Sequence, residues 1–229
     1  LQPPDQLAVL LARAEAAVIR RRTDAAAAAL EAAAPLAAGA GVAQALRLKL
    51  LRARNLMNLA QSEPARSDLT EVRAAAEAAG LPALAVSAQY NLAEIAFTRG
   101  DFVEAERLNR GTEEMYLALY GTDHVSVAQT MHRRALIHQE IGDLDTALTL
   151  YDAARAVFER TVGTAHPLWF SNQIERTRVL TRLGRHDEAL AVLDALPGPD
   201  ASRVEADSYN RLLAQAALGI ALFEMDKPA

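Results

Sequence analysis

The chemistry of this chain is best judged first from its histidines, because histidine is the side chain most often used to bind zinc. His132 and His138 are six residues apart, which puts them on different faces of a helix instead of the i, i+4 spacing of helical zinc ligands. His124 and His166 share a sequence context, because a Gly-Thr pair precedes each of them at the same distance. We interpret this second pair as a repeated packing or capping element. The histidine spacing therefore predicts no metal site.

Motifs for nucleophilic and phosphate chemistry are missing from the sequence as well. The chain has no cysteine, no serine in a G-x-S-x-G turn and no glycine-rich phosphate loop. Its carboxylates, such as Glu94, Glu113, Glu114 and Glu140, are scattered over helix-forming segments, where a charge usually faces solvent. We therefore predict a protein that is not an enzyme and that uses no cofactor.

Charge and hydropathy exclude two classes of partner. The formal net charge is −5 with a pI near 5.6, and the basic run Arg20–Arg22 is short, which predicts no direct binding to nucleic acid. The longest apolar tract, residues 32–43, is interrupted by Pro35, Gly39 and Gly41 and is too short to cross a bilayer. We expect a cytoplasmic protein without membrane contact, because the absence of cysteine fits a reducing compartment.

The elements that carry these residues are predicted to be helices. Alanine, the strongest helix former, makes up 50 of the 229 residues. Gly100, Gly142 and Gly184 recur at equal intervals along the chain. Glycine is favoured just after a helix, and Asp101 and Asp143 follow at the position of an N-cap for the next one. The pattern predicts repeated hairpins of two antiparallel helices.

Apolar residues spaced three and four apart extend this pattern along most of the chain. Upstream of residue 80 the steps are less regular, and breaks are marked by Gly39, Gly41 and the segment at residues 80–82. Helices are predicted over residues 4–21, 24–38, 42–60, 63–79, 83–99, 102–119, 124–141, 144–161, 166–183, 186–195 and 202–224.

These residues resemble the tetratricopeptide repeat. The small-residue position of its second helix corresponds to Ala105, Ala147 and Ala189. The 42-residue step and the loop at residues 120–124 are similar to the kinesin-light-chain-like subfamily, which is common in bacterial signalling proteins. The resemblance implies an all-α, right-handed superhelical solenoid of antiparallel hairpins, with about five hairpins and a C-terminal capping helix.

The resemblance also implies one solenoid domain over residues 1–229. Within it, residues 1–80 are interpreted as degenerate repeats, 84–196 as clear 42-residue repeats and 202–229 as a capping or truncated repeat. The chain begins with leucine rather than methionine. A longer parent protein and the oligomeric state therefore stay open.

In this family the first helices of successive repeats line a concave groove that holds extended or helical peptides. Counting from first-helix starts at residues 86, 128 and 170, with one hairpin before them, places a set of side chains in that groove. The predicted groove residues are Arg54, Tyr90, Asn91, Glu94, His132, Arg133, Gln139, Arg178 and Arg182. The subfamily uses paired asparagines to hold the ligand backbone, and only Asn91 is present here. The identity of the ligand therefore does not transfer.

Arginine is the most frequent charged residue in this set. Arg54, Arg133, Arg178 and Arg182 would bring guanidinium groups to one groove of an acidic protein. Guanidinium groups bind carboxylates and phosphates in a bidentate way. We therefore hypothesise a protein or peptide partner with an acidic or phosphorylated segment. The alternative, that these arginines are solvated or paired with a neighbouring helix, is equally open.

An aromatic pair, Trp169 and Phe170, follows Pro167 at a predicted helix start. Tryptophan is favoured as an anchor at protein interfaces. A residue at this place also commonly packs as a hydrophobic staple against the structure before it. The sequence leaves both fates open.

Two functions fit these observations. The first is a non-catalytic adaptor or sensor module that binds a peptide or partner protein, within a bacterial signalling protein such as a Ser/Thr kinase or a transcription regulator. The alternative is a peptide-sensing regulator whose superhelix changes curvature when it binds a small signal peptide. The two differ in the ligand, because the second predicts marked thermal stabilisation by a free peptide.

Overall fold

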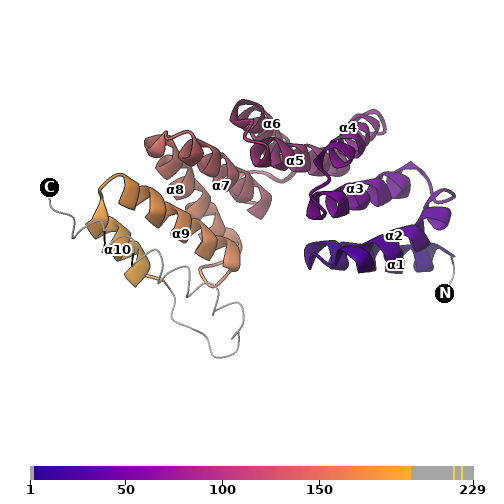
Figure 1. The fold of residues 1–229 in the computed structure, drawn as a ribbon, viewed down its shortest axis with the longest axis horizontal. Helices are drawn as coiled ribbons and strands as arrows, with labels where there is room; N and C mark the ends of the chain where they lie inside the picture. The colour runs from indigo at the N-terminus through magenta and orange to yellow at the C-terminus, as the bar shows by residue number, and fades with distance from the viewer. Residues whose placement is uncertain (1–2, 197–218, 220–222, 224–229) are drawn as a thin grey trace. The chain divides into compact units, whose positions relative to one another are not determined.

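The computed structural model describes residues 3–196 together with residues 219 and 223. Within residues 3–196 the chain forms ten α-helices and no strand (Figure 1). The helices are α1 (Pro3–Ile19), α2 (Thr23–Ala37), α3 (Val42–Asn58), α4 (Ser62–Ala78), α5 (Pro82–Thr98), α6 (Phe102–Tyr120), α7 (Val125–Glu140), α8 (Leu144–Thr161), α9 (Pro167–Arg182) and α10 (His186–Asp194). These bounds agree closely with the predicted ranges, so the all-α prediction is confirmed. The predicted helix over residues 202–224 lies outside the described residues.

The turns between hairpin helices follow from two residues in succession. Gly100 and Gly142 have φ angles of 76° and 85°, in the left-handed region where glycine carries no steric cost. The Oδ1 atom of the next residue then accepts a hydrogen bond from a main-chain N–H of the following helix. For Asp101 the donor is Glu104 N at 3.1 Å, and for Asp143 it is Thr146 N at 3.3 Å. The predicted pairing of a C-terminal glycine with an N-capping aspartate is confirmed.

The two histidines that follow a Gly-Thr pair are helix caps. His124 Nδ1 accepts a hydrogen bond from Ser126 N at 3.2 Å, and His166 Nδ1 accepts one from Leu168 N at 3.2 Å. The interpretation of this pair as a repeated capping element is therefore confirmed. Among the residues that the structure describes, no group of three or more His, Cys, Asp or Glu side chains could hold a metal ion.

The chain divides into two compact units, residues 1–115 and 116–229. In unit 1, α1 packs on α2 and α3 packs on α4, and the first helices α1, α3 and α5 contact one another in that order. The first helices thus form one layer and the second helices another. A core cluster joins α1, α2 and α3 through Leu7, Leu11, Ala14, Leu30, Ala33, Ala37 and Leu51.

Unit 2 repeats the same packing with larger side chains. α7 packs on α8, α9 packs on both α8 and α10, and α7 contacts α9. Trp169 is only 4% exposed and lies in a cluster with Phe158 and Ala128. Its Nε1 donates a hydrogen bond to Glu159 Oε1 at 3.2 Å. Of the two fates left open for Trp169, packing against the preceding hairpin is therefore the observed one.

The length and apolar character that a membrane-spanning helix needs are combined in none of the described helices.

Candidate peptide-binding site

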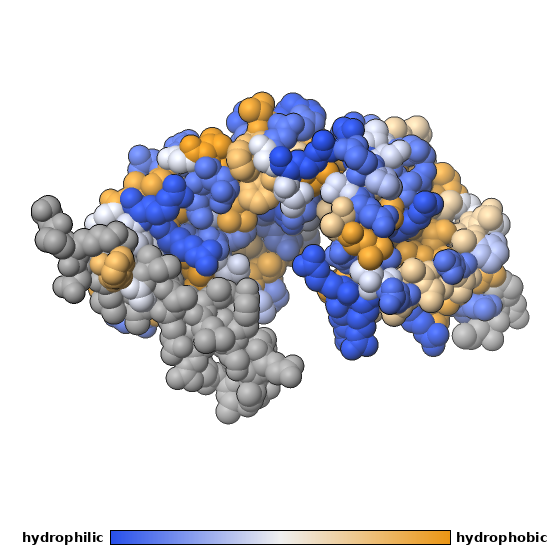
Figure 2. All heavy atoms as spheres, in the orientation of Figure 1, coloured by the Kyte–Doolittle hydropathy of each residue, from blue (hydrophilic) through white to orange (hydrophobic). Residues whose placement is uncertain are grey.

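The predicted groove residues of unit 2 lie on two neighbouring helices. His132, Arg133 and Gln139 are on α7, and Arg178 and Arg182 are on α9. The two helices contact each other, so these side chains belong to adjoining first helices, as the sequence predicts. We call the surface formed by His132, Arg133, Arg178 and Arg182 the α7–α9 face. Hydrophilic side chains are prominent over this part of the molecule (Figure 2).

Gln139 ties three helices together beneath this face. The side chain is 8% exposed, and its Oε1 accepts a hydrogen bond from the Tyr151 hydroxyl of α8 at 3.0 Å. Its Nε2 donates to Glu175 Oε2 of α9 at 3.3 Å, and its main-chain oxygen accepts a bond from Arg182 Nη1 at 2.9 Å. Because a buried amide is costly unless its polar atoms are paired, these contacts fix the spacing of α7, α8 and α9.

Tyr151 is a permanent donor in this network. Its side chain is fully buried, and this burial, together with the nearby charge of Glu175, raises the pKa of the hydroxyl far above its ordinary value. The hydroxyl therefore keeps its proton throughout the physiological range. Gln139 Oε1 is accordingly held as the acceptor.

Arg178 and Arg182 are exposed but anchored. Arg178 Nη1 lies 2.7 Å from Glu175 Oε1, and the Glu175 side chain is only 16% exposed against 42% for Arg178. Arg182 is held by the Gln139 carbonyl described above. A guanidinium group has five N–H donors in a fixed plane, so one such contact orients the group and leaves it able to bind a further anion. Both arginines therefore have protein partners as well as exposed surface.

His132 contributes a neutral ring to the α7–α9 face. The ring meets Tyr151 edge-on with centroids 5.3 Å apart, and its Nδ1 lies 3.3 Å from Asn172 Nδ2. Burial lowers the pKa of His132 to about 4, because desolvation disfavours the charged form. At neutral pH the unprotonated Nδ1 can accept the amide proton of Asn172. His132 therefore supplies shape and one hydrogen bond, without a positive charge.

The predicted groove residues of unit 1 lie on α3 and α5. Arg54 is on α3, whereas Tyr90, Asn91 and Glu94 are on α5, and all four are half-buried. The Asn91 amide donates a hydrogen bond to the Ser87 carbonyl of its own helix at 2.6 Å. The one asparagine that matches the ligand-holding position of the resembled subfamily is thus bonded to its own backbone in this structure.

Three residues of the buried layer were not among the predicted site residues. They are Tyr151, Asn172 and Glu175, of which Tyr151 and Asn172 are fully buried. Glu175 was accessible to sequence reasoning, because Asn91, Arg133 and Glu175 occupy the same position in three successive repeats. That position is an amide in the first repeat, a guanidinium in the second and, in the third, a carboxylate that binds Arg178.

Comparison with known protein families gives a match over part of the chain. The family model described as tetratricopeptide repeat matches residues 84–160 and, in a second overlapping match, residues 126–195. Residues 84–195, slightly less than half of the chain, are thus similar to the tetratricopeptide repeat. The match runs from α5 to α10, whereas α1 to α4 form the same kind of hairpin without it.

Solved structures show the same fold. A putative kinesin light chain from P. anserina is 22% identical, with 79% of this chain and 94% of that chain covered and a TM-score of 0.59. Aspartyl phosphate phosphatase F from Bacillus subtilis is 16% identical, with 99% and 61% covered and a TM-score of 0.72. The Rap conjugation gene regulator of plasmid pLS20, solved with the Phr* peptide, is 13% identical, with 95% and 73% covered and a TM-score of 0.67.

These likenesses establish an all-α solenoid of the tetratricopeptide-repeat type. At such low identity they do not carry a ligand or an activity from one protein to another. No curated protein matches the chain.

Proposed function

We propose that this chain is a non-catalytic protein–protein interaction module that binds a peptide segment of a partner protein at the α7–α9 face. One observation carries the proposal: the exposed Arg178 and Arg182 are held in place by buried polar groups beneath them. Gln139, Tyr151 and Glu175 set the distance between the helices. Such preorganisation reduces the entropic cost of binding.

The charge of this face supports an acidic or phosphorylated segment as the ligand. Arg178 and Arg182 are exposed, each is held through its Nη1 atom, and Arg133 lies on the adjoining helix. Planar guanidinium groups favour carboxylate and phosphate partners. The corresponding binding residues of unit 1, as the repeat pattern predicts them, are Arg54, Tyr90, Asn91 and Glu94.

The proposed setting is a cytoplasmic bacterial signalling protein, with the module as an adaptor or sensor. A second candidate, a regulator that senses a free signal peptide, is favoured by one observation. The Rap regulator of plasmid pLS20, which shares the fold, was solved as a complex with the Phr* peptide. A free peptide at 100 times its Kd would stabilise such a regulator by about 2.7 kcal/mol.

Charge reversal on the α7–α9 face tests the proposal. The bait is the full chain, exposed to lysate of the native host, and the variant is the double substitution Arg133→Glu and Arg178→Glu. The matched control is Arg20→Glu and Arg22→Glu, two exposed arginines outside the face, because it changes the net charge by the same amount. Circular dichroism verifies that both variants keep their helicity.

We expect the face variant to lose a specific partner that the wild-type chain and the control retain. Peptides from that partner, titrated into the chain, then locate the bound segment. Partners retained equally by all three chains would contradict binding at this face. A strong thermal shift with a free peptide and no retained protein would favour the second candidate.

A further inference from the structure

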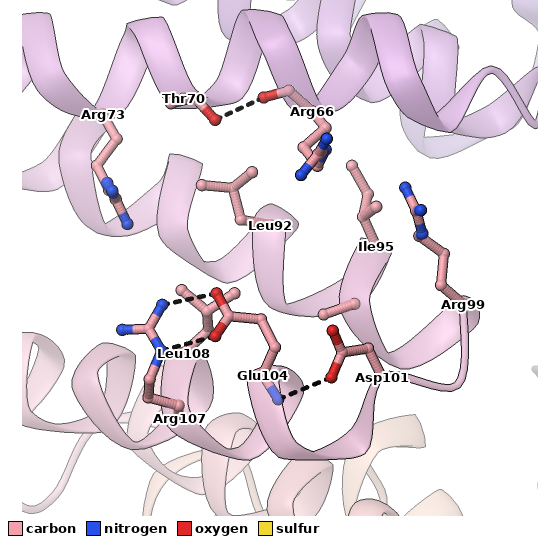
Figure 3. Close-up of a pocket in the computed structure, with 11 residues that line it drawn as sticks. Arg66, Thr70, Arg73, Leu92, Ile95, Arg99, Asp101, Glu104, Arg107 and Leu108 are labelled. Carbon is pink, nitrogen blue, oxygen red and sulfur yellow. Dashed lines mark hydrogen bonds and ion pairs between the residues drawn. The ribbon is translucent and has the colours of Figure 1, made fainter.

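Unit 1 contains a pocket that the repeat pattern does not predict. It has a volume of about 230 Å³ and lies between α4, α5 and α6. Four arginines line it, namely Arg66 and Arg73 from α4, Arg99 at the end of α5 and Arg107 from α6. Figure 3 shows Arg66, Arg73 and Arg99 around the space over the aliphatic side chains of α5. We call this site the arginine pocket.

The arginine pocket is separate from the predicted groove. On α5, the lining residues Leu92, Ile95 and Arg99 share one side of the helix, since they are spaced by three and four residues. Tyr90 and Glu94, which the sequence assigns to the groove, project from the opposite side by the same periodicity of 3.6 residues per turn. A ligand in this pocket would therefore contact a different face of α5.

The floor of the arginine pocket is apolar and the rim is charged. Leu92, Ile95 and Leu108 are 8%, 2% and 5% exposed and form the aliphatic part of the lining. An anion with an apolar group attached would match both parts. The volume is below the roughly 300–1,000 Å³ of sites that enclose drug-sized ligands, so it suits a single side chain better than a whole cofactor.

The positive charges of the four arginines are neutralised to different degrees by carboxylates of the same chain. Arg107 forms a bidentate pair with Glu104, with both N···O distances at 2.6 Å. Arg66 and Arg99 share Glu63. The ion pair of Arg73 with Glu77 is the longest, at 4.0 Å. Arg73 is therefore the guanidinium best placed to gain from an added anion.

The charges around the pocket also act across it. Glu104 on α6 has a lowered pKa, first because of its hydrogen bond with Arg107 and further because of the positive charge of Arg73 on α4. The field of Arg73 thus reaches the far wall. A carboxylate or phosphate between these walls would experience more than one guanidinium group.

The equivalent space two repeats later is also a pocket, of about 300 Å³, but it has a different lining, which includes Arg155, Arg176 and Glu188. Arg176 occupies the repeat position that Leu92 holds in unit 1, so an arginine replaces part of the apolar floor. Its Nε donates a hydrogen bond to Asp152 Oδ1 at 2.7 Å. The floor of large aliphatic side chains with four arginines around it is therefore not repeated in this second pocket.

We propose that the arginine pocket binds a peptide segment of a partner protein in which one large apolar side chain stands beside carboxylate or phosphate groups. The apolar side chain lies on Leu92, Ile95 and Leu108, and the anionic groups pair with Arg66 and Arg73. This site is additional to the α7–α9 face and does not depend on it.

The test uses an array of eleven-residue peptides and the labelled full chain. The central residue is Phe, Leu or Trp, and the flanking residues are Glu in one arm and phosphoserine in another. Matched peptides carry Ala at the centre or Lys in the flanks. The tightest binder is then titrated by fluorescence anisotropy against the wild-type chain and three variants.

The pocket variant is Arg66→Gln with Arg73→Gln, which removes charge while keeping good helix formers. The control is Arg110→Gln, an exposed arginine of α6 that lies outside the pocket lining. The third variant, Arg133→Gln with Arg178→Gln, reports on the α7–α9 face. We expect Kd to rise at least tenfold for the pocket variant and to stay within twofold for the other two.

Three outcomes would overturn the proposal. One is an acid-flanked array without binders, and another is equal binding by Ala-centred peptides, which would show that the floor is unused. The third is a Kd that changes only in the α7–α9 variant, which would assign the peptide to that face. The relative affinities of the Glu and phosphoserine arms decide between carboxylate and phosphate as the anion.

Discussion

The two units build the same hairpin from different side chains. The cluster that joins α1, α2 and α3 in unit 1 consists of leucine and alanine, and no aromatic residue precedes Tyr90. Unit 2 packs around Tyr151, Phe158 and Trp169 and buries polar side chains such as Gln139 among them. Unit 1 also buries polar side chains, such as Asn109 at 1% exposure, so the buried aromatic rings are what distinguishes unit 2.

The turn between the two helices of a hairpin also differs along the chain, although the change does not fall at the boundary between the units. Gly100 and Gly142 take the left-handed conformation between α5 and α6 and between α7 and α8. In the corresponding turns of the two earlier hairpins, Arg21 and Ala60 do so, with φ angles of 53° and 59°. A non-glycine residue in this region costs roughly 1–2 kcal/mol. The fold therefore continues through α1 to α4 although its sequence markers do not, which explains why the family match begins only at residue 84.

The largest test of this comparison is the truncation of a core aromatic in unit 2. Phe158 is 1% exposed, and Phe158→Ala should lower the free energy of unfolding by about 3–5 kcal/mol. Urea unfolding is followed by circular dichroism and by fluorescence of Trp169, the one tryptophan of the chain. The counterpart in unit 1 is Leu11→Ala, at a fully buried position.

Circular dichroism should detect both substitutions, whereas Trp169 fluorescence should respond more strongly to Phe158→Ala. Equal shifts of the fluorescence midpoint for the two variants would contradict the view that unit 2 depends on its own aromatic cluster. The two units would then differ in the composition of their cores but not in what stabilises them.

Acid provides the second test, because every histidine of the chain is in unit 2. The pKa of His132 is lowered to about 4 in the folded state from 6.5. The unfolded chain therefore binds a proton first as the pH falls. The stability that this group contributes is complete above pH 6.5 and is lost as the pH approaches 4. The expected loss is on the order of 2–3 kcal/mol.

Urea unfolding at pH 7, 5.5 and 4 measures this effect, with His132→Phe as the matched variant that keeps an aromatic ring. Its pH dependence should be weaker than that of the wild-type chain across this window. An identical pH dependence in both chains would show that His132 does not titrate as the structure indicates.

The smallest expected effects are at the turns, and they have opposite signs in the two units. Ala60→Gly should stabilise unit 1 by about 1 kcal/mol, because it relieves the left-handed strain. Gly142→Ala should destabilise unit 2 by about the same amount. Nothing lies within 4 Å of the position that the new Cβ would occupy at Gly142, so the effect isolates the backbone. Thermal unfolding measures both, and changes of the same sign would contradict the comparison.

Most of the fold could be predicted because its signals are local. The glycines at Gly100 and Gly142, the aspartate after each of them and the helical periodicity act within one or two turns of helix. They predict helix ranges close to those observed, and the repeated setting of His124 and His166 indicates their capping role. The proline at residue 167 likewise stands in the first turn of α9.

The candidate site could be predicted only in outline. The repeat register assigned Gln139, Arg178 and Arg182 to one groove. The three residues lie on adjoining helices, but the Gln139 side chain is buried. The register did not indicate that Glu175 holds Arg178 or that the Gln139 carbonyl holds Arg182. Such contacts depend on side-chain rotamers and on residues distant in the sequence. The spacing of residues along the chain gives no information about either.

The sequence by itself determined the helices, their turns and the repeat, because each depends on residues close along the chain. Only the tertiary structure decided which polar groups meet. Gln139 reaches Tyr151 and Glu175 across three helices, and the arginine pocket collects Arg66 and Arg107 from two helices that α5 separates in the sequence. Packing brings these groups together, since burial leaves each polar side chain only those partners that the neighbouring helices place within reach.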